Sequence, residues 1–245
     1  MSESQFNEIA PYYDSLMAGV PYKLWVDYLE GILRRLDYHP NTVLDVACGT
    51  GNVSEILAER GYQVVGIDIS QPMIEAAKRK RSNVEYHAQD VAELNLGRQF
   101  DLAISLFDSL NYVINPDQLR RGMRRVAEHL VTGGLFIFDV NTIYALSNHF
   151  FDQANLSPNR EPRYVWRSEY DHSTRICRVD MTFEVTENGA KRQFKEVHYQ
   201  RGHTLEELAQ WLMEAGFEVV ETFHAYRFRK PNRRSDRVFF VARKL

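Results

Sequence analysis

Residues 43–51 read Val-Leu-Asp-Val-Ala-Cys-Gly-Thr-Gly, which passes from a strand through a glycine turn into a helix. The run TVLDVA at 42–47 is mainly apolar and predicts a buried strand. Gly49 and Gly51 allow the backbone to approach a ligand closely, and the N–H groups of the following helix point at that ligand. We therefore expect a ligand at the carboxyl end of this strand. The alternative is a tight strand-to-helix turn that holds none.

Strand and helix patterns alternate on both sides of this stretch. Apolar residues recur at helical spacing over 22–36, and apolar runs predict further buried strands at 62–69, 84–90, 100–107 and 134–140. Ser70 can cap the helix after the second strand, and Asn115 opens a helix that we expect Gly133 and Gly134 to close. Five such alternations favour a parallel sheet with helices on both faces.

The periodicity changes to two after about residue 160, as in an antiparallel β meander. Apolar residues alternate with polar ones at Cys177, Val179, Met181, Phe183 and Val185. Thr204 and Glu207 form a capping box for a helix at 205–215, and two closing strands follow at 218–223 and 237–242. The fold class is thus α/β, a doubly wound, mostly parallel seven-stranded sheet with an inserted antiparallel meander.

Composition excludes several classes of protein. The 245 residues carry 30 Lys and Arg against 33 Asp and Glu, a net charge of −3, which provides no global positive field for nucleic acid. No apolar run reaches the ~18 residues of a membrane span, and the polar N-terminal stretch lacks a signal core. Cys48 and Cys177 allow one disulfide at most, and we expect two free thiols in a cytoplasmic protein.

Asp68 ends the second strand, where it can accept hydrogen bonds from both hydroxyls of a ribose. The G-x-G-x-x-G fingerprint of dinucleotide-binding proteins is incomplete, because Ser54 occupies the third glycine position. Two further blocks lie at later strand ends, HAQDVAEL at 87–94 and FDSLNY at 107–112, and HLVTGGLFIFDV follows at 129–140. With these blocks the chain resembles the class I S-adenosylmethionine-dependent methyltransferases over roughly residues 40–145 and the closing strands.

The meander and the segments around it narrow the resemblance to a bacterial subgroup of small-molecule-type methyltransferases, and the architecture is similar to the amino-sugar N-methyltransferases. The resemblance implies a Rossmann-like domain at 40–150 and 201–245, an N-terminal helical arm and lid at 1–39, and a β insert at 151–200 that covers the active site. It implies S-adenosylmethionine as cofactor, held by Tyr13, Asp45, Ala47, Cys48, Gly49, Thr50, Gly51, Asp68, Ile69, Met73, Asp90, Val91 and Leu106.

The acceptor is expected between the N-terminal tyrosines, the residues after the fourth strand and the meander. We predict that it contacts Tyr12, Asp108, Asn111, Tyr112, Tyr199 and Arg201, with His203 nearby. Tyr13, Tyr112 and His198 are the candidate catalytic residues, and His198 or a tyrosine could act as general base. Since strand residues alternate, His198 and Tyr199 should face opposite sides. A packing role is the alternative for each of these residues.

Several alternatives stay open at this stage. Asp108, Asp139 and Asn141 could hold Mg²⁺, although we expect no metal. The basic residues Arg227, Arg229, Lys230, Arg233, Arg234 and Arg237 should form a solvated loop, with an acidic substrate or RNA as the alternative partner. The Asn-Pro-Pro-Tyr signature of many nucleic-acid methylases is absent.

The rival functions are an NAD-dependent oxidoreductase and a non-catalytic module that binds S-adenosylmethionine. We expect a small-molecule acceptor and neither a nucleic-acid nor a membrane partner. Whether nitrogen, oxygen or carbon is methylated, and the oligomeric state, are open.

Overall fold

A computed structural model describes residues 5–157, 161–187 and 189–245. Its larger sheet has seven strands in the order β10-β11-β5-β4-β1-β2-β3. The neighbouring pairs among β1 to β5 are parallel, and β11 runs antiparallel to both of its neighbours. This confirms the mostly parallel seven-stranded sheet. Its strands are β1 (Thr42–Val46), β2 (Gln63–Asp68), β3 (Glu85–Ala88), β4 (Phe100–Ser105), β5 (Leu130–Asn141), β10 (Phe217–His224) and β11 (Arg237–Lys244).

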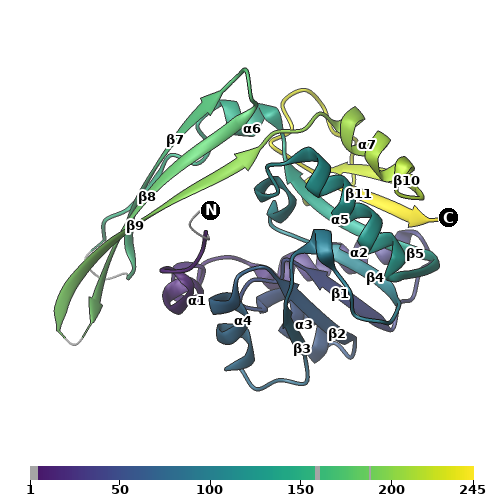
Figure 1. Ribbon diagram of the computed structural model, residues 1–245, viewed down its shortest axis with the longest axis horizontal. Helices are drawn as coiled ribbons and strands as arrows, with labels where there is room; N and C mark the ends of the chain where they lie inside the picture. Colours follow the sequence, from purple (N-terminus) through teal and green to yellow (C-terminus); the bar gives the residue numbers. More distant parts are fainter. Residues whose placement is uncertain (1–4, 158–160, 188) are drawn as a thin grey trace.

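Helices cover both faces of this sheet (Figure 1). One core contains Leu44 and Val46 of β1 and packs against α5 (Pro116–Glu128) and α7 (Leu205–Glu214). The other contains Val43 and packs against α2 (Tyr22–Arg35), α3 (Asn52–Glu59) and α4 (Gln71–Lys78). Successive residues of β1 therefore enter opposite cores, which explains why its sequence is almost continuously apolar.

Two helix starts form as their sequences predict. The Ser70 hydroxyl accepts a hydrogen bond from the Met73 amide at the start of α4. Thr204 and Glu207 make the reciprocal capping box of α7. Because α4 and α7 lie on opposite faces, these caps fix the entry of the chain into each helical layer.

The prediction that Gly133 and Gly134 close the α5 helix is wrong. The helix ends at Glu128, and β5 already begins at Leu130. The two glycines lie inside the strand, where the pairing with β4 shifts from Leu130 to Leu135 and Gly133 takes a φ of 79°. The two glycines thus form a bulge within the strand. In the sequence, such a glycine pair looks the same as one that ends a helix.

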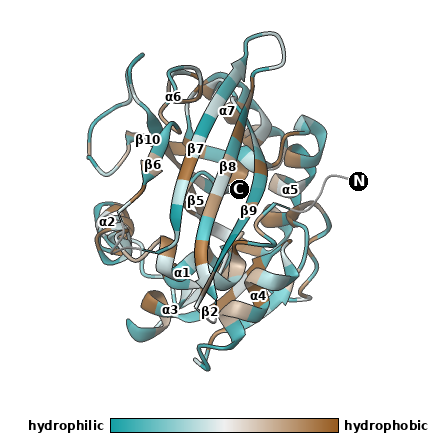
Figure 2. Ribbon diagram, turned by 90° about the vertical axis from the view of Figure 1, so that its left-hand side faces the viewer, coloured by the Kyte–Doolittle hydropathy of each residue, from teal (hydrophilic) through white to brown (hydrophobic). Residues whose placement is uncertain are grey.

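The smaller sheet is antiparallel, with the order β6-β7-β8-β9, and Figure 1 shows it arching over one edge of the larger sheet. The alternating apolar residues of β8 are buried on its inner face, and in Figure 2 the colour alternates along the strand because successive side chains point to opposite faces. This is the predicted meander. Its strands are β6 (Gln153–Asn155), β7 (Arg163–Asp171), β8 (Ile176–Glu187) and β9 (Ala190–Arg201).

An N-terminal arm, here residues 5–20, lies in the angle between the two sheets (Figure 1). It contains a 3-10 turn, η1 (Ala10–Tyr12), and the short helix α1 (Tyr13–Leu16). Ile9 is buried in the core of the smaller sheet. Asp14 accepts hydrogen bonds from Thr50 and Asn52 beside the glycine turn and pairs with Lys80. The arm is thereby attached to both layers.

Three short helices complete the described chain. They are η2 (Val91–Glu93), η3 (Ser109–Tyr112) and α6 (Ile143–Ser147). Within the described residues, no helix combines the length and the apolar character needed to cross a membrane.

Candidate active site

A cavity of about 680 Å³ lies between the two sheets beneath the arm. One part, the sheet end, is lined by Gly49, Asp68 and Asp90, which follow β1, β2 and β3. The other part, the meander end, is lined by Trp166 and His198 among residues of the smaller sheet. The carboxyl ends of parallel strands are where α/β sheets bind ligands, and the meander encloses that edge.

The glycine turn at the sheet end depends on a left-handed backbone. Ala47, Gly49 and Gly51 have φ values of 59°, 57° and 80°. A Cβ atom on Gly51 would lie 2.2 Å from the Tyr86 hydroxyl oxygen, so glycine is required there for packing. A Cβ atom on Gly49 would meet no atom of the described residues within 4 Å, so they leave the wall of the cavity clear at this point.

Asp68 fixes the turn from the next strand. One carboxylate oxygen accepts the Gly49 amide at 2.8 Å, and the other accepts the Ser70 amide at 2.8 Å. Burial raises the pKa of Asp68 despite these two hydrogen bonds. Each carboxylate oxygen has a second lone pair, which leaves Asp68 able to accept hydrogen bonds from a ligand in the cavity.

Asp90 follows β3 and lines the sheet end of the cavity. Its carboxylate caps η2 by accepting the Ala92 amide at 2.9 Å, and it accepts the Gln118 side-chain amide at 2.7 Å. Val91 and Met73 line the same part of the cavity, and the side chain of Ile69 is 69% exposed beside Asp68. The predicted residues Tyr13, Ala47, Gly49, Asp68, Ile69, Met73, Asp90 and Val91 thus line one cavity.

The other predicted cofactor residues lie behind the cavity wall. Asp45 is buried, its carboxylate accepts the Ser54 hydroxyl at 2.5 Å, and burial raises its pKa to about 7. Thr50 is turned toward Asp14 of the arm at 2.6 Å. Cys48, Gly51 and Leu106 are likewise outside the lining of the cavity. Asp45, Cys48, Thr50 and Gly51 belong to β1 and the turn itself and support it from behind, while Leu106 follows β4 and is buried in the core beside the sheet.

The candidate catalytic residues meet at the meander end. The Tyr112 hydroxyl oxygen lies 3.4 Å from His198 Nδ1, and the other ring nitrogen of His198 lies 2.8 Å from Glu196. Both Tyr112 and His198 line the cavity, and Tyr13 lines it from the arm. Burial raises the pKa of Tyr112, and the negative charge of Asp108 adds to the shift. Glu196 was not among the predicted site residues, although it lies two residues before His198 on β9 and shares its strand face.

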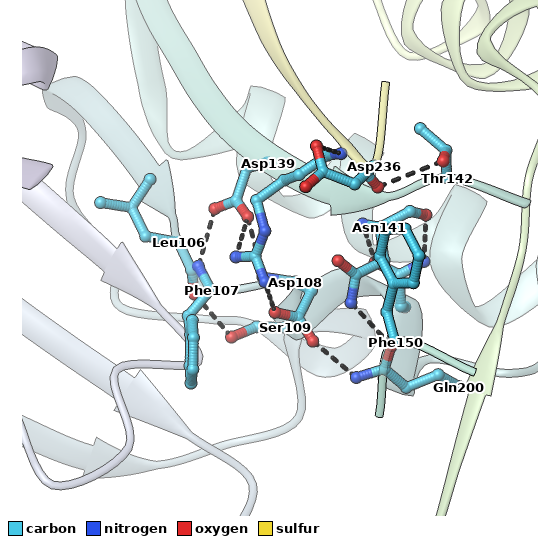
Figure 3. Close-up of polar contacts among 12 residues, drawn as sticks. Leu106, Phe107, Asp108, Ser109, Asp139, Asn141, Thr142, Phe150, Gln200 and Asp236 are labelled. Carbon is cyan, nitrogen blue, oxygen red and sulfur yellow. Dashed lines mark hydrogen bonds and ion pairs between the residues drawn. The ribbon is translucent and has the colours of Figure 1, made fainter. Parts of the chain in front are cut away.

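A second polar cluster follows β4. Phe107 and Asp108 take positive φ values of 68° and 52°, and Asp139 on β5 accepts both of their amides at 2.7 and 3.0 Å (Figure 3). Such a backbone is strained for non-glycine residues, and the Asp139 carboxylate holds it in place. Gln200 of the meander donates to the Asp108 carboxylate, which joins the two sheets (Figure 3).

The prediction that Arg237 belongs to a solvated loop is wrong. Arg237 begins β11, and its guanidinium pairs with both Asp108 and Asp139. Burial raises the pKa of Asp108 to about 6, while the charge of Arg237 lowers it. A guanidinium therefore occupies the place considered for a metal ion, and no cluster with metal-ligand character occurs among the residues described.

Several predicted acceptor contacts are not supported. Asn111 is buried; its side-chain NH₂ donates to the backbone carbonyls of Asn141 and Arg201, and its side-chain oxygen accepts the Asn141 amide. Tyr12 stacks on Phe194, and its hydroxyl donates to Glu187. Neither Asn111, Arg201 nor Tyr12 lines the cavity, because each is engaged in packing or in hydrogen bonds behind it.

His203 and Tyr199 also differ from the expectation. His203 is buried away from the cavity, with its ring edge against Trp211. Tyr199 lines the cavity together with His198, although successive strand residues were expected to face opposite sides. The arm passes beside Tyr199, since the Tyr199 amide donates to the side chain of Gln5, and the cavity thus reaches both faces of β9.

Aromatic side chains dominate the rest of the meander end. The Tyr164 and Trp166 rings lie 5.0 Å apart on β7, and Phe183 of β8 packs edge-on against Trp166. Phe150 and Phe151, which follow α6, also line the cavity, and Phe151 packs against the same apolar cluster as Trp166. A molecule in this part of the cavity would meet apolar surface on most sides and polar groups at Tyr112 and His198.

Comparison with known proteins agrees with this geometry. The model of a family described as "Methyltransferase domain" matches residues 43–134. A protein of Geobacillus sp. (strain WCH70), named as a methyltransferase, is 32% identical over 245 residues, covering 98% of this chain and 99% of the relative. The crystal structure of an S-adenosylmethionine-dependent methyltransferase from Clostridium acetobutylicum ATCC 824 has a TM-score of 0.85 at 29% identity, covering 98% and 99% of the two chains.

A relative with a named substrate matches a shorter part of the chain. The dTDP-3-amino-3,4,6-trideoxy-alpha-D-glucopyranose N,N-dimethyltransferase of Streptomyces venezuelae is 27% identical over 184 residues. The match covers 74% of this chain and 76% of the relative.

Proposed function

Because the chain belongs to the S-adenosylmethionine-dependent methyltransferases, we propose that it methylates a small molecule bound at the meander end of the cavity. The observation that carries this proposal is that a single cavity joins the glycine turn and Asp68 to the aromatic wall with Tyr112 and His198. Cofactor and acceptor can thus share one space. A volume of about 680 Å³ lies within the range of small-molecule sites.

The residues at the sheet end fit the cofactor. The clear wall at Gly49 leaves space for a ligand against the turn, and Asp68 retains free lone pairs for ribose hydroxyls. We assign cofactor contacts to the eight predicted residues that line the cavity. Asp45, Cys48, Thr50 and Gly51 act by shaping the turn, and Leu106 acts as a buried core residue after β4. The bounds of the described elements fit the proposed cofactor domain at 40–150 with 201–245 and the β insert at 151–200, whereas α2, which falls within the arm predicted at 1–39, packs in the core of the larger sheet.

S-adenosylmethionine supplies an electrophilic methyl group on a sulfonium when it is bound. The protein must hold the acceptor atom in line with that methyl and keep water out. The aromatic wall formed by Tyr164, Trp166 and Phe183 would orient the acceptor, and Tyr13 of the arm would cover the reacting atoms. In this arrangement the rate arises chiefly from alignment.

The acceptor should have an apolar body and one protonated nucleophilic group. Apolar surface surrounds most of the meander end, and Tyr112 with His198 provides a place for one proton. The named Streptomyces relative methylates an amino group of a nucleotide sugar, and an amine or hydroxyl of a compact metabolite is the class that we propose here.

Calorimetric titration tests the proposal first. S-adenosylmethionine and S-adenosylhomocysteine should bind at micromolar concentration, and NAD should not. Methyl-labelled cofactor incubated with a small-molecule extract should then yield a labelled product, with less product from a Tyr112→Phe variant. Cofactor binding without any labelled product would favour a non-catalytic module, and no cofactor binding would overturn the proposal.

A further inference from the structure

Glu196 connects the N-terminal arm to the candidate base. One of its carboxylate oxygens accepts the backbone amides of Glu8 and Ile9 at 2.8 and 3.1 Å. The other lies 2.8 Å from His198 Nε2. The side chains of Glu196 and His198 are 8% and 1% exposed. A single buried carboxylate thus has one oxygen on the arm and one on the imidazole.

The contact with Glu196 decides which nitrogen of His198 carries its proton. An ionised carboxylate only accepts hydrogen bonds, so the proton of a neutral His198 must be on Nε2. Nδ1 is then a free acceptor, and it faces the Tyr112 hydroxyl at 3.4 Å. Phe6 of the arm packs edge-on against the His198 ring, with centroids 4.4 Å apart.

We propose that Glu196 is a positioning residue that assembles the proton acceptor of the methyl transfer only while the N-terminal arm is closed. The two arm amides hold the carboxylate where it can orient His198, and opening of the arm removes both amides and the Phe6 ring. The inference rests on the proposed function.

Proton transfer in the closed state balances within these residues. The proton of the acceptor passes to the Tyr112 oxygen as the hydroxyl proton of Tyr112 passes to His198 Nδ1. The resulting imidazolium is paired with Glu196, and no other bond changes in the protein. Among the described residues, Asp108 and Arg237 also act on Tyr112, and they are paired with each other.

A Glu196→Gln variant separates the two functions of the carboxylate. The amide oxygen of glutamine can still accept from Glu8 and Ile9, but its NH₂ group would then face His198 and donate to Nε2. His198 should therefore change to the Nδ1–H tautomer, which cannot accept the Tyr112 proton. We would record ¹⁵N–¹H correlation spectra of histidine-labelled protein with S-adenosylhomocysteine, and assign His198 by its absence in His198→Gln.

Hydrogen exchange of the arm tests the other half of the coupling. In Glu196→Ala, exchange at Glu8 and Ile9 should become about tenfold faster or more, because the hydrogen bonds that protect these amides are lost. Arg192→Ala is the matched control. Arg192 lies on the same strand and pairs with the side chain of Glu8, but it does not contact the Glu8 amide. Thermal unfolding of each variant shows whether it is folded.

The results expected are an Nε2–H tautomer in the native protein, an Nδ1–H tautomer in Glu196→Gln, and faster exchange in Glu196→Ala than in Arg192→Ala. An unchanged tautomer in Glu196→Gln, or equal exchange in the two alanine variants, would overturn the proposal. Neither measurement needs an acceptor or turnover. Failure of the coupling can therefore be distinguished from failure of the methyltransferase proposal, which shows in cofactor binding and product formation.

Discussion

The guanidinium of Arg237 lies 2.6 Å from the carboxylate of Asp139, across the antiparallel pair of β11 and β5. Its other terminal nitrogen binds Asp108, so one cation balances two buried carboxylates. Removal of one partner from a buried ion pair typically costs about 3–5 kcal/mol, because the remaining charge stays unpaired. We expect Arg237→Met to lower the free energy of unfolding by about this amount, measured by urea denaturation.

The companion variant for this measurement is Arg237→Met combined with Asp108→Asn. It also removes one of the two carboxylate charges that are left unpaired, and it should recover part of the lost free energy of unfolding. A single variant within about 1 kcal/mol of the native protein would fit an exposed pair and contradict our interpretation of the cluster.

Gly49 and Gly51 should respond differently to alanine. At Gly49 the new methyl group has no neighbour within 4 Å in the described part of the chain, so we expect a stability cost of only about 1–2 kcal/mol for the left-handed backbone. It would enter the space proposed for the cofactor and weaken cofactor binding at least tenfold. At Gly51 it would collide with Tyr86, and we expect a stability loss of about 3 kcal/mol or more. Calorimetry and urea denaturation separate the two effects. Equal behaviour of the variants would contradict the placement of the cavity.

Replacement of Asp68 should weaken the cofactor complex. Hydrogen bonds to a charged group contribute about 1.5–3 kcal/mol each, so loss of the two contacts to a ribose should reduce affinity about 100-fold or more in Asp68→Ala. Asp68→Asn keeps one accepting oxygen and should lose less. Glu75→Ala, on the exposed side of α4, serves as the control. Titration with S-adenosylhomocysteine measures all three, and native affinity in Asp68→Ala would remove the ribose assignment.

His203 should make the protein sensitive to acid. Among the described residues neither of its ring nitrogens has a hydrogen-bond partner, and burial lowers its pKa to about 4. The folded protein therefore holds His203 neutral, while the unfolded chain protonates near pH 6.5. Below pH 6.5 the unfolded chain binds a proton at His203 that the folded protein does not bind. The free energy of unfolding is therefore highest above pH 6.5 in this respect and decreases as the pH falls toward 4. Between pH 7.5 and 4.5 the contribution amounts to about 2–3 kcal/mol.

Between pH 7.5 and 4.5 the free energy of unfolding should decrease by about 2–3 kcal/mol less in a His203→Leu variant than in the native protein. Urea denaturation at both pH values measures this difference. Asp45 and Asp108, with pKa values raised by burial to about 7 and about 6, titrate in the same range with the opposite sign. Both are present in both proteins, so the difference isolates His203. Parallel stability curves would show that folding leaves the pKa of His203 unchanged and would contradict this prediction.

Local sequence patterns predicted the elements that apolar periodicity defines. The continuous run at β1 and the alternation along β8 correspond to the observed burial. The misplaced end of α5 shows where such patterns fail, because a glycine pair has the same sequence whether it ends a helix or forms a bulge within β5.

The polar contacts of the site are harder to predict, since they join distant segments. Arg237 is 98 positions from Asp139 and 129 from Asp108, and only the register of β11 against β5 brings them together. Glu196 could have been found from its strand face, which it shares with Phe194 and His198. Its bonds to the arm span 187 and 188 positions and have no local signal.

The attachment of the arm affects how the protein can be handled. Gln5 contacts β9 beside the cavity, so an affinity tag attached before it would lie close to Phe6 and Tyr13, the arm residues that cover the cavity. The last residue, Leu245, is 70% exposed and lies beside Gly216, at the end of β11 that is farther from the cavity. Attachment after Leu245 is therefore the better choice for a purification tag, a surface linker or a dye, because it leaves the arm over the cavity undisturbed.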